Sequence, residues 1–515
     1  MIEETKPGDG IWRFEEGEMK MKVRTSIALI ALLGAAVAQA QTRGGGRPHE
    51  DRPVYIVTLG DSIMWGQGLP ENNKFRNIVA QWIQKQYFGV RTAIQIPTHA
   101  HSGAHITVDP GQDTQTGLPG EIPSHWPSVT MQVDLTVADL PRFGATADQV
   151  DLVLLDGGIN DVDISNILNP AKHINDLHNL VVSNCVLRMQ GLLTKVRKAF
   201  PNAAIIVIGY YPIASGESDL MSLLALSTAA INDFVVGASG IGSIPGIFAA
   251  GAEGMVVKDR LVGLSTEFNN TAQAGLSDDV RQFIQNDPKS NTMVVPALGG
   301  VLHSIPRVAL AWPFFSNGNS YAAPQTYLWN LLQFAGDEVR GLSGTHPESP
   351  DTPGQVAYSR AQACKIANRA SGFCVDASMG HPNIAGAQAY ANAIISILQM
   401  FPEWVGLRQL NVSVSPAPLP RNVLTTVTIL VTDLVTRQPV PNAVIQVGGQ
   451  VVRSGQPFRY KVTCVARPVN PRLPPNAIVE FPDFPPPTFT VTAPGYLTGN
   501  VEFDVGAIAP GERCR

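Results

Sequence analysis

The chain has 515 residues, of which 44% are hydrophobic and 15% are charged, and its formal net charge is −5 at pH 7. A chain of this length and hydrophobic content can bury a large core and is expected to form more than one domain. The net charge is mild, and the sequence has no basic run and no basic patch interleaved with aromatics, so it argues against a nucleic-acid-binding protein.

The amino terminus has the pattern of a bacterial-type secretory signal peptide. Basic residues precede an apolar run at 26–37, and the Ala-Gln-Ala segment at 38–40 is typical of a cleavage site. An uncleaved anchor is the alternative, although the apolar run is short for a bilayer span. We expect a leader over 1–40, a linker over 41–52, and a secreted, periplasmic or extracellular protein with no transmembrane span after cleavage.

Gly60-Asp61-Ser62 follows a strand-like run at 54–59 and precedes a helical stripe that begins near Phe75. A serine at a strand-to-helix turn is a candidate nucleophile. The carboxyl ends of parallel strands open onto the usual ligand crevice, and a helix amino terminus there supplies N–H groups for an oxyanion. Gly-Asp-Ser also occurs in ordinary turns, so the tripeptide needs support from other segments. We expect Asp61 to brace the turn through backbone hydrogen bonds.

The loop after the apolar residues 93–96 contains His99, His101 and Gly103. A glycine in such a loop allows a backbone N–H to approach a ligand. The two histidines lack a third ligand at a recognisable spacing, so no metal site is predicted. We interpret them as loop or substrate-contact residues.

A second strand-like run, at 150–155, leads to a loop that carries Asn160 and Asp161. An apolar helical stripe that includes Cys185 then precedes a buried-strand candidate at 204–209. Cys185 is therefore interpreted as an inert core thiol rather than a nucleophile, and Asp161 is expected to brace its turn. Strands that alternate with helices in this way predict a parallel sheet with helices on both faces.

Two histidines far downstream are candidates for a catalytic base. His381 lies in the turn directly before a small-residue helix at 384–400. His346 is the alternative, but the Pro-rich residues after it are typical of a loop rather than of a helix start. We therefore favour His381.

The five cysteines fit an oxidising destination. Cys364 and Cys374 bracket the loop before His381, and Cys464 and Cys514 both lie near the carboxyl end. Each pair is a candidate disulfide.

The segments around Ser62, Gly103, Asn160 and His381 together resemble the four blocks of the SGNH, or GDSL-type, serine hydrolase family, in the family's chain order. The resemblance implies a three-layer flavodoxin-like α/β sandwich with a parallel sheet, and ester hydrolysis without a metal or cofactor. If the family's residue roles apply at the matching positions, Ser62 is the nucleophile and His381 is the base. The oxyanion hole consists of the Ser62 N–H, the Gly103 N–H and the Asn160 amide.

The chain departs from the family pattern at the acidic member of the triad. In the family an acid usually stands three residues before the histidine, and here that position is Ser378. The nearest acid is Asp376, which is therefore the provisional residue that orients His381. A backbone carbonyl in the same role is the alternative.

The resemblance places the hydrolase domain over 53–404, with an insertion near 214–355. The insertion includes an uncharged stretch at 234–252, whose glycines and proline argue against a transmembrane helix. We expect helices at 277–284 and 326–334 and a strand at 293–296. The insertion is interpreted as a lid or an acyl-binding wall, with core packing as an equal alternative.

Toward the carboxyl end the sequence becomes rich in proline and in strand-forming residues, which predicts a small all-β sandwich over 408–515. Strand-like runs occur at 424–431, 443–447 and 489–496. This part resembles bacterial carboxypeptidase-regulatory-like or Ig-like modules. Such a module is expected to space or attach the enzyme, through contact with a cell surface or polymer.

The expected function is a secreted serine ester hydrolase that works through an acyl-enzyme. The apolar insertion favours lipid or other hydrophobic acyl esters as substrates. One alternative is a carbohydrate acetylesterase of the same fold. The other, motivated by Ser378 at the acid position, is a non-catalytic surface-binding protein on a degenerate hydrolase scaffold.

Overall fold

The structure is a computed structural model that describes most of the chain between residues 52 and 505. The described residues are 52–108, 120–216, 218, 220, 223, 227, 252–287, 291–295, 301–305, 307–312, 353–367, 374, 377, 378, 380–420, 423–434, 436–462 and 487–505. The predictions that lie outside them concern the signal peptide, His346, Asp376, the Cys464–Cys514 pair, most of the stretch 234–252 and the helix at 326–334.

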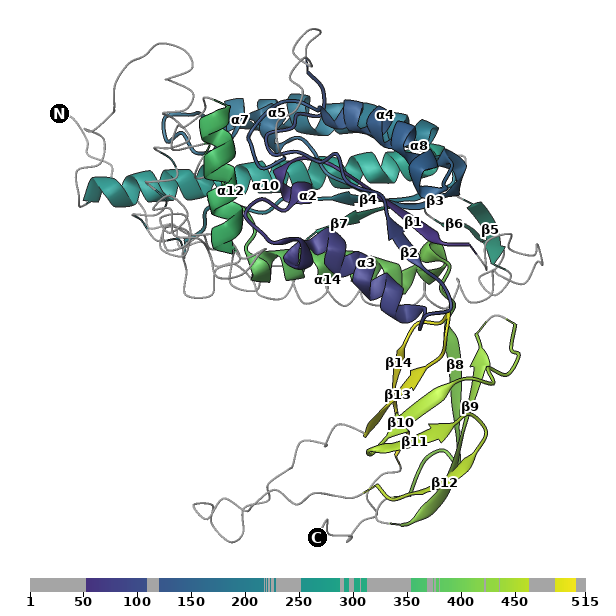
Figure 1. Cartoon of the computed structure of the whole chain (residues 1–515). Coiled ribbons are helices and arrows are strands. Elements are labelled where there is room, and N and C mark those ends of the chain that lie inside the picture. The colour runs from purple at the N-terminus through teal and green to yellow at the C-terminus, as the bar shows by residue number, and fades with distance from the viewer. Residues whose placement is uncertain are drawn as a thin grey trace, which may run out of the picture.

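A five-stranded parallel sheet forms the centre of the N-terminal part of the chain (Figure 1). In chain order, its strands are β1 (Val54–Leu59), β2 (Ala93–Gln95), β3 (Val150–Leu155), β4 (Ala204–Ile208) and β7 (Val308–Ala311). They lie side by side in the order β2-β1-β3-β4-β7, and every neighbouring pair is parallel. The predicted α/β fold with a parallel sheet is confirmed.

Helices cover both faces of this sheet. The helices are α2 (Ser62–Trp65), α3 (Phe75–Gln86), α4 (Val129–Asp139), α5 (Ile159–Val162), α6 (Ile164–Ile167), α7 (Ile174–Leu180), α8 (Leu187–Ala199), α10 (Ala252–Asn286), α12 (Pro353–Ile366) and α14 (Ile384–Met400). Short 3-10 turns occur at Glu71–Asn73, Leu140–Phe143, Ala147–Gln149 and Pro402–Val405, and a π turn at Val181–Val186 joins α7 to α8. In Figure 1, α3 and α14 lie below the sheet, and α4 and α8 lie above it.

Side chains of β1 alternate between two apolar cores because successive residues of a strand point to opposite faces. Val54 and Ile56 pack in the core that contains residues of α3 and α14. Tyr55 and Val57 pack in the core that contains residues of α4 and α8. The sheet is therefore the middle layer of a three-layer sandwich, with one apolar core between it and each of the two helical layers.

The insertion adds structure that the sequence patterns only partly indicate. The helix expected at 277–284 is the end of the much longer α10. The strand expected at 293–296 is β5 (Asn291–Val295), which pairs with β6 (Val301–Ile305) in an antiparallel two-stranded sheet separate from the central one. Strand β7 and helix α12 are not among the predicted elements.

The C-terminal β module, defined here as β8 to β14, consists of two antiparallel sheets (Figure 1). One sheet contains β8 (Leu410–Ser415), β9 (Thr425–Asp433) and β12 (Pro457–Tyr460). The other contains β10 (Val444–Val447), β11 (Gln450–Arg453), β13 (Thr488–Thr492) and β14 (Gly499–Glu502). The two sheets enclose an apolar core that includes Val427, Ile445, Phe489 and Phe503, and the predicted all-β domain is confirmed.

The module meets the α/β part next to α3. The backbone N–H and the hydroxyl of Thr498 both donate to Oε1 of Gln86, at 3.1 and 3.2 Å. Nowhere in the described part of the chain is a helix both long and apolar enough to cross a membrane.

Candidate active site

Three loops meet at the carboxyl edge of the central sheet. Ser62 begins α2 directly after β1, and Asn160 lies in α5 directly after β3. The backbone N–H of His101 donates to the carbonyl of Gly60 at 3.2 Å, and Nδ2 of Asn160 donates to the carbonyl of Ala104 at 3.0 Å. The loops that carry Ser62, Gly103 and Asn160 are therefore joined to one another.

A fourth loop brings His381 to the same place. Nε2 of His381 lies 2.7 Å from Oγ of Ser62, although 319 positions separate the two residues in the chain. The loop ends where α14 begins, because the Asn383 side chain caps that helix by accepting from the N–H of Gly386 at 3.1 Å. Ser62 is only 4% exposed, whereas His381 is half-buried, so the hydroxyl is largely shielded from water and the imidazole remains partly accessible.

The turn before Ser62 leaves no room for a side chain at Gly60. A Cβ there would lie 1.8 Å from Oδ1 of Asp156. The amide of Gln132 bonds to both backbone groups of Gly60, at 2.8 Å each, and the N–H of Asp61 donates to Oδ1 of Asp156 at 2.8 Å. Gln132 is absent from the sequence-based site because no motif marks its position on α4.

Asp61 braces the turn, as expected from the sequence. Its carboxylate accepts from the N–H of Ile63 at 2.9 Å and from the hydroxyl of Tyr210 at 2.7 Å. The Tyr210 oxygen in turn accepts from the N–H of Ile159 at 3.2 Å. Tyr210, which sequence patterns do not single out, thus connects the Ser62 turn to the helix that carries Asn160.

The two carboxyl groups behind Ser62 are completely buried. Burial raises the pKa of Asp61 to about 6, although its hydrogen bonds from Ile63 and Tyr210 act in the opposite direction. Burial and then the charge of Asp61 raise the pKa of Asp156 well above its usual value. The pair therefore favours a state with fewer than two negative charges at neutral pH.

Gly103 is fixed in a conformation that favours glycine. Its φ is +78°, and a Cβ on it would lie 2.7 Å from the backbone nitrogen of Ser124. The neighbouring backbone is held by Asp161, whose Oδ2 accepts from the N–H of Ile106 at 2.8 Å and whose Oδ1 lies 2.7 Å from Nη1 of Arg188. Asp161 has the bracing role expected for it.

The other candidate residues have separate partners. His99 Nε2 lies 2.8 Å from Oδ2 of Asp139, and His101 Nδ1 lies 2.8 Å from the carbonyl of Ser102. Across the described residues, no group of three or more His, Cys, Asp or Glu side chains is placed to hold a metal ion. Cys185 is fully buried, and burial raises the pKa of its thiol, which disfavours a thiolate nucleophile.

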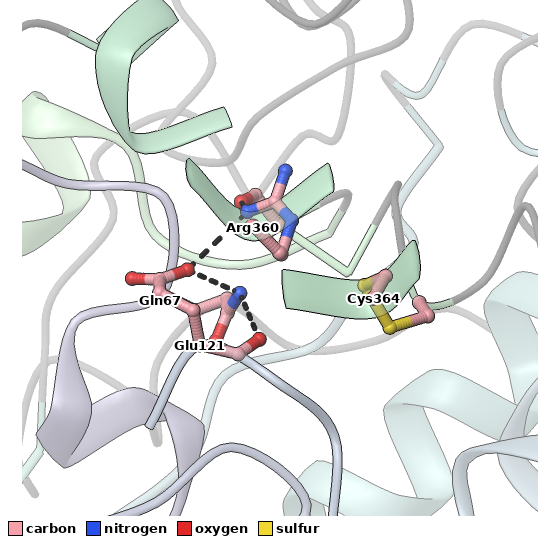
Figure 2. The surroundings of a disulfide bond; sticks show 6 residues. Gln67, Glu121, Arg360 and Cys364 are labelled. Carbon is pink, nitrogen blue, oxygen red and sulfur yellow. Dashed lines mark hydrogen bonds and ion pairs between the residues drawn. A yellow bond between two sulfur atoms is a disulfide. The ribbon is translucent and has the colours of Figure 1, made fainter. Parts of the chain in front are cut away.

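The predicted disulfide between Cys364 and Cys374 is confirmed (Figure 2). It joins the end of α12 to the segment that leads to His381. Both sulfurs are buried next to Ile122. Asp376, the acid expected to orient His381, lies outside the described residues, so this role stays a prediction.

One known family matches part of the chain that carries these loops. Residues 58–239 match the model of the GDSL-like Lipase/Acylhydrolase family. This segment includes Ser62, Gly103 and Asn160 but ends before His381. No curated protein sequence matches the chain.

Several solved structures are similar at low identity. An extracellular lipase from Streptomyces rimosus is 12% identical, with a TM-score of 0.33, over 67% of this chain and 99% of that one. Phospholipase A1 from Streptomyces albidoflavus NA297 is 16% identical, with a TM-score of 0.24, over 44% and 77%. A family two carbohydrate esterase from Clostridium thermocellum is 13% identical, with a TM-score of 0.27, over 70% and 67%. Similarity at this level does not extend to a substrate.

Proposed function

We infer from the membership of residues 58–239 in the GDSL-like lipase/acylhydrolase family that the α/β domain is a serine ester hydrolase that forms an acyl-enzyme. The observation that carries the proposal is the 2.7 Å separation between Oγ of Ser62 and Nε2 of His381. A serine hydroxyl is a weak nucleophile until a base takes its proton, and an imidazole within hydrogen-bond distance can do so.

In the proposed reaction, His381 removes the proton from Ser62 as Oγ attacks the ester carbonyl. The N–H groups of Ser62 and Gly103 and the amide of Asn160 donate to the oxyanion that develops. His381 then protonates the departing alcohol, and water releases the acyl group from Ser62 with His381 again as the base. Two hydrogen bonds support this arrangement, one from the His101 N–H to the Gly60 carbonyl and one from the Asn160 amide to the Ala104 carbonyl. They fix the loops that carry the donors before substrate binds.

The orientation of His381 is assigned to Asp376, with a backbone carbonyl as the alternative. If a carbonyl holds the Nδ1 proton, Asp376→Ala will reduce kcat less than His381→Ala does. Equal losses in the two variants would refute the backbone-carbonyl alternative. Asp376→Asn, which keeps the shape of the side chain, separates the effect of its charge from the effect of its packing.

The first test is covalent labelling by a fluorophosphonate. The reagent should modify Ser62 in the folded wild-type protein and should not modify Ser62→Ala, with the adduct located by peptide mass spectrometry. Folded wild-type protein that stays unlabelled would favour a non-catalytic binding protein instead. Ser413→Ala is a matched control, because Ser413 lies on β8 and is exposed.

We propose lipid or other hydrophobic acyl esters as the substrates, because the insertion includes the uncharged stretch 234–252. A panel of nitrophenyl esters from acetate to palmitate, beside phospholipid and acetyl-xylan, tests this choice. A rise in kcat/KM with acyl length supports it. An equal kcat/KM at all acyl lengths, or a preference for acetyl-xylan, would contradict the choice of hydrophobic esters and favour the carbohydrate acetylesterase instead.

Secretion is proposed from the amino-terminal sequence alone. Expression of the full chain in a bacterial host, followed by fractionation and amino-terminal sequencing, should recover protein that begins after Ala40 outside the cytoplasm. Membrane-bound protein that retains residues 1–40 would contradict the proposal.

The C-terminal β module is proposed to attach or space the enzyme at a surface or polymer.

A further inference from the structure

A buried arginine lies beside the loop that carries His381. Arg360, on α12, is 0% exposed. Its Nη1 donates to Oγ of Ser378 and also lies 3.4 Å from Oε2 of Glu121. Figure 2 shows the Arg360 side chain directed toward Glu121. Ser378 occupies the position three residues before His381, and its carbonyl accepts from the N–H of His381 at 2.9 Å.

Glu121 is bonded on its other side to the segment that carries Ser62. It accepts from Nε1 of Trp65 at 2.9 Å. It also accepts from Nε2 of Gln67 at 2.6 Å (Figure 2). Trp65 is the last residue of α2, the short helix that Ser62 begins. One carboxylate therefore contacts both the helix that begins at Ser62 and the arginine that is bonded to the loop of His381.

Ser62 and His381 are thus connected by two routes. The direct route is their 2.7 Å hydrogen bond. The second runs behind the site, from α2 through Trp65 to Glu121, and then through Arg360 to Ser378. The Cys364–Cys374 disulfide joins α12 to the same loop.

We propose that Arg360 and Glu121 are positioning residues that set the distance and orientation between Ser62 and His381. The proposal rests on the proposed ester hydrolysis. A buried ion pair costs desolvation and is weak support for stability alone, whereas a displacement of about 1 Å in a catalytic pair can reduce the rate about 10²-fold. Where the related hydrolases place an acid, this chain has a hydroxyl bonded to a buried cation, which the Glu121 carboxylate neutralises.

The test measures kcat and KM for a nitrophenyl ester in three variants. Arg360→Met removes the donors at nearly constant side-chain length and should reduce kcat about 10²-fold with little change in KM. Ser378→Ala removes only the hydroxyl and should reduce kcat about tenfold. Arg360→Lys keeps the charge and should recover part of the loss in Arg360→Met. This ranking, with KM nearly constant, is what a merely structural role would not produce.

Arg197→Met is the matched control. Arg197 is a second buried arginine, with Nη2 lying 2.9 Å from Asp287 and Nη1 donating to the carbonyl of Ala203, at the amino edge of the sheet. Its replacement should lower the thermal midpoint and leave kcat unchanged. The proposal is overturned if Arg360→Met retains wild-type kcat, or if Arg197→Met loses as much kcat as Arg360→Met.

Crystal structures of the wild-type protein and of Ser378→Ala separate this proposal from the proposed function. They also serve if Arg360→Met does not fold. A longer separation between Oγ of Ser62 and Nε2 of His381 in the variant supports the positioning role, even if the wild-type protein hydrolyses no ester and takes no fluorophosphonate. An unchanged separation and an unchanged imidazole orientation overturn it.

Discussion

The carboxyl edge of the parallel sheet and the C-terminal β module bury different kinds of side chain. At the sheet edge, Asp61, Asp156 and Tyr210 are at most 1% exposed, and hydrogen bonds connect them. In the module, β9 alternates in the usual way, with Val427, Ile429 and Val431 buried and their neighbours more exposed. These apolar side chains need no hydrogen-bond partners.

The two regions should therefore respond differently to substitution. Removing a methyl group from an apolar core costs stability in proportion to the cavity it leaves. Removing a partner from a buried polar network leaves another polar group unsatisfied and shifts the groups that it held. We therefore expect small changes at the sheet edge to alter the reaction, and larger changes in the module to alter stability alone.

The largest expected effect is on activity in Ser62→Ala and His381→Ala. Each should reduce kcat/KM for a nitrophenyl ester by at least about 10⁴-fold, because nucleophile and base act as a unit. For the same reason, the double variant should lose little more than either single variant. Additive losses would mean that the 2.7 Å contact between the two side chains is not used in the reaction.

A smaller loss is expected when one oxyanion donor is removed. Asn160→Ala should reduce kcat about 10²–10³-fold with a modest change in KM. Asn166→Ala is the control, because Nδ2 of Asn166 donates to the carbonyl of Val162 at 2.8 Å in the next helix along. Wild-type kcat in Asn160→Ala would remove Asn160 from the oxyanion hole.

Much of the fold can be predicted because its main elements are local patterns. The apolar runs that become β1, β3 and β4 and the small-residue helix α14 are each recognisable in a short window. Strand β7 is different, since it has only four residues and lies within the stretch 214–355 interpreted as an insertion. Nothing in its own sequence indicates that it pairs with β4.

The same contrast applies to the site. Ser62, Gly103, Asn160 and His381 stand in motifs, but the side chains that hold their loops do not. Gln132 lies 72 positions from Gly60, Tyr210 lies 149 from Asp61, and Arg360 lies 239 from Glu121. Each of these contacts depends on how elements pack across the sheet edge, which no local spacing encodes.

The buried Asp61 gives a pH dependence of stability that the module should lack. Its pKa is raised from 3.8 to about 6 by burial, so between these two pH values the folded state holds a proton that the unfolded state has lost. The free energy of unfolding should therefore decrease as the pH rises from about 4 to about 6. In Asp61→Asn this decrease should be smaller, because Asp61 no longer contributes, whereas Asp156 and the other carboxyl groups with a raised pKa still do.

Urea unfolding at several pH values from 4 to 7 measures this effect. The difference in unfolding free energy between Asp61→Asn and the wild-type protein should shift in favour of the variant as the pH increases. The comparison is best made with a probe of the α/β domain. Parallel pH profiles for the two proteins would show that Asp61 ionises in the folded state at its usual pKa.

The smallest effect on the reaction is expected from a severe change in the module. Phe503 is 1% exposed, and its ring centroid lies 4.6 Å from that of Phe489 and 5.0 Å from that of Tyr460. Phe503→Ala should destabilise the module by about 3–5 kcal/mol. It should leave kcat unchanged, because none of these rings lies in either apolar core that flanks the parallel sheet.

Thermal unfolding and kcat measured on the same variant test this prediction. A separate unfolding transition of the module at lower temperature, with unchanged kcat, is the expected result. A fall in kcat would mean that the contact of Thr498 with Gln86 transmits the module's stability to the site.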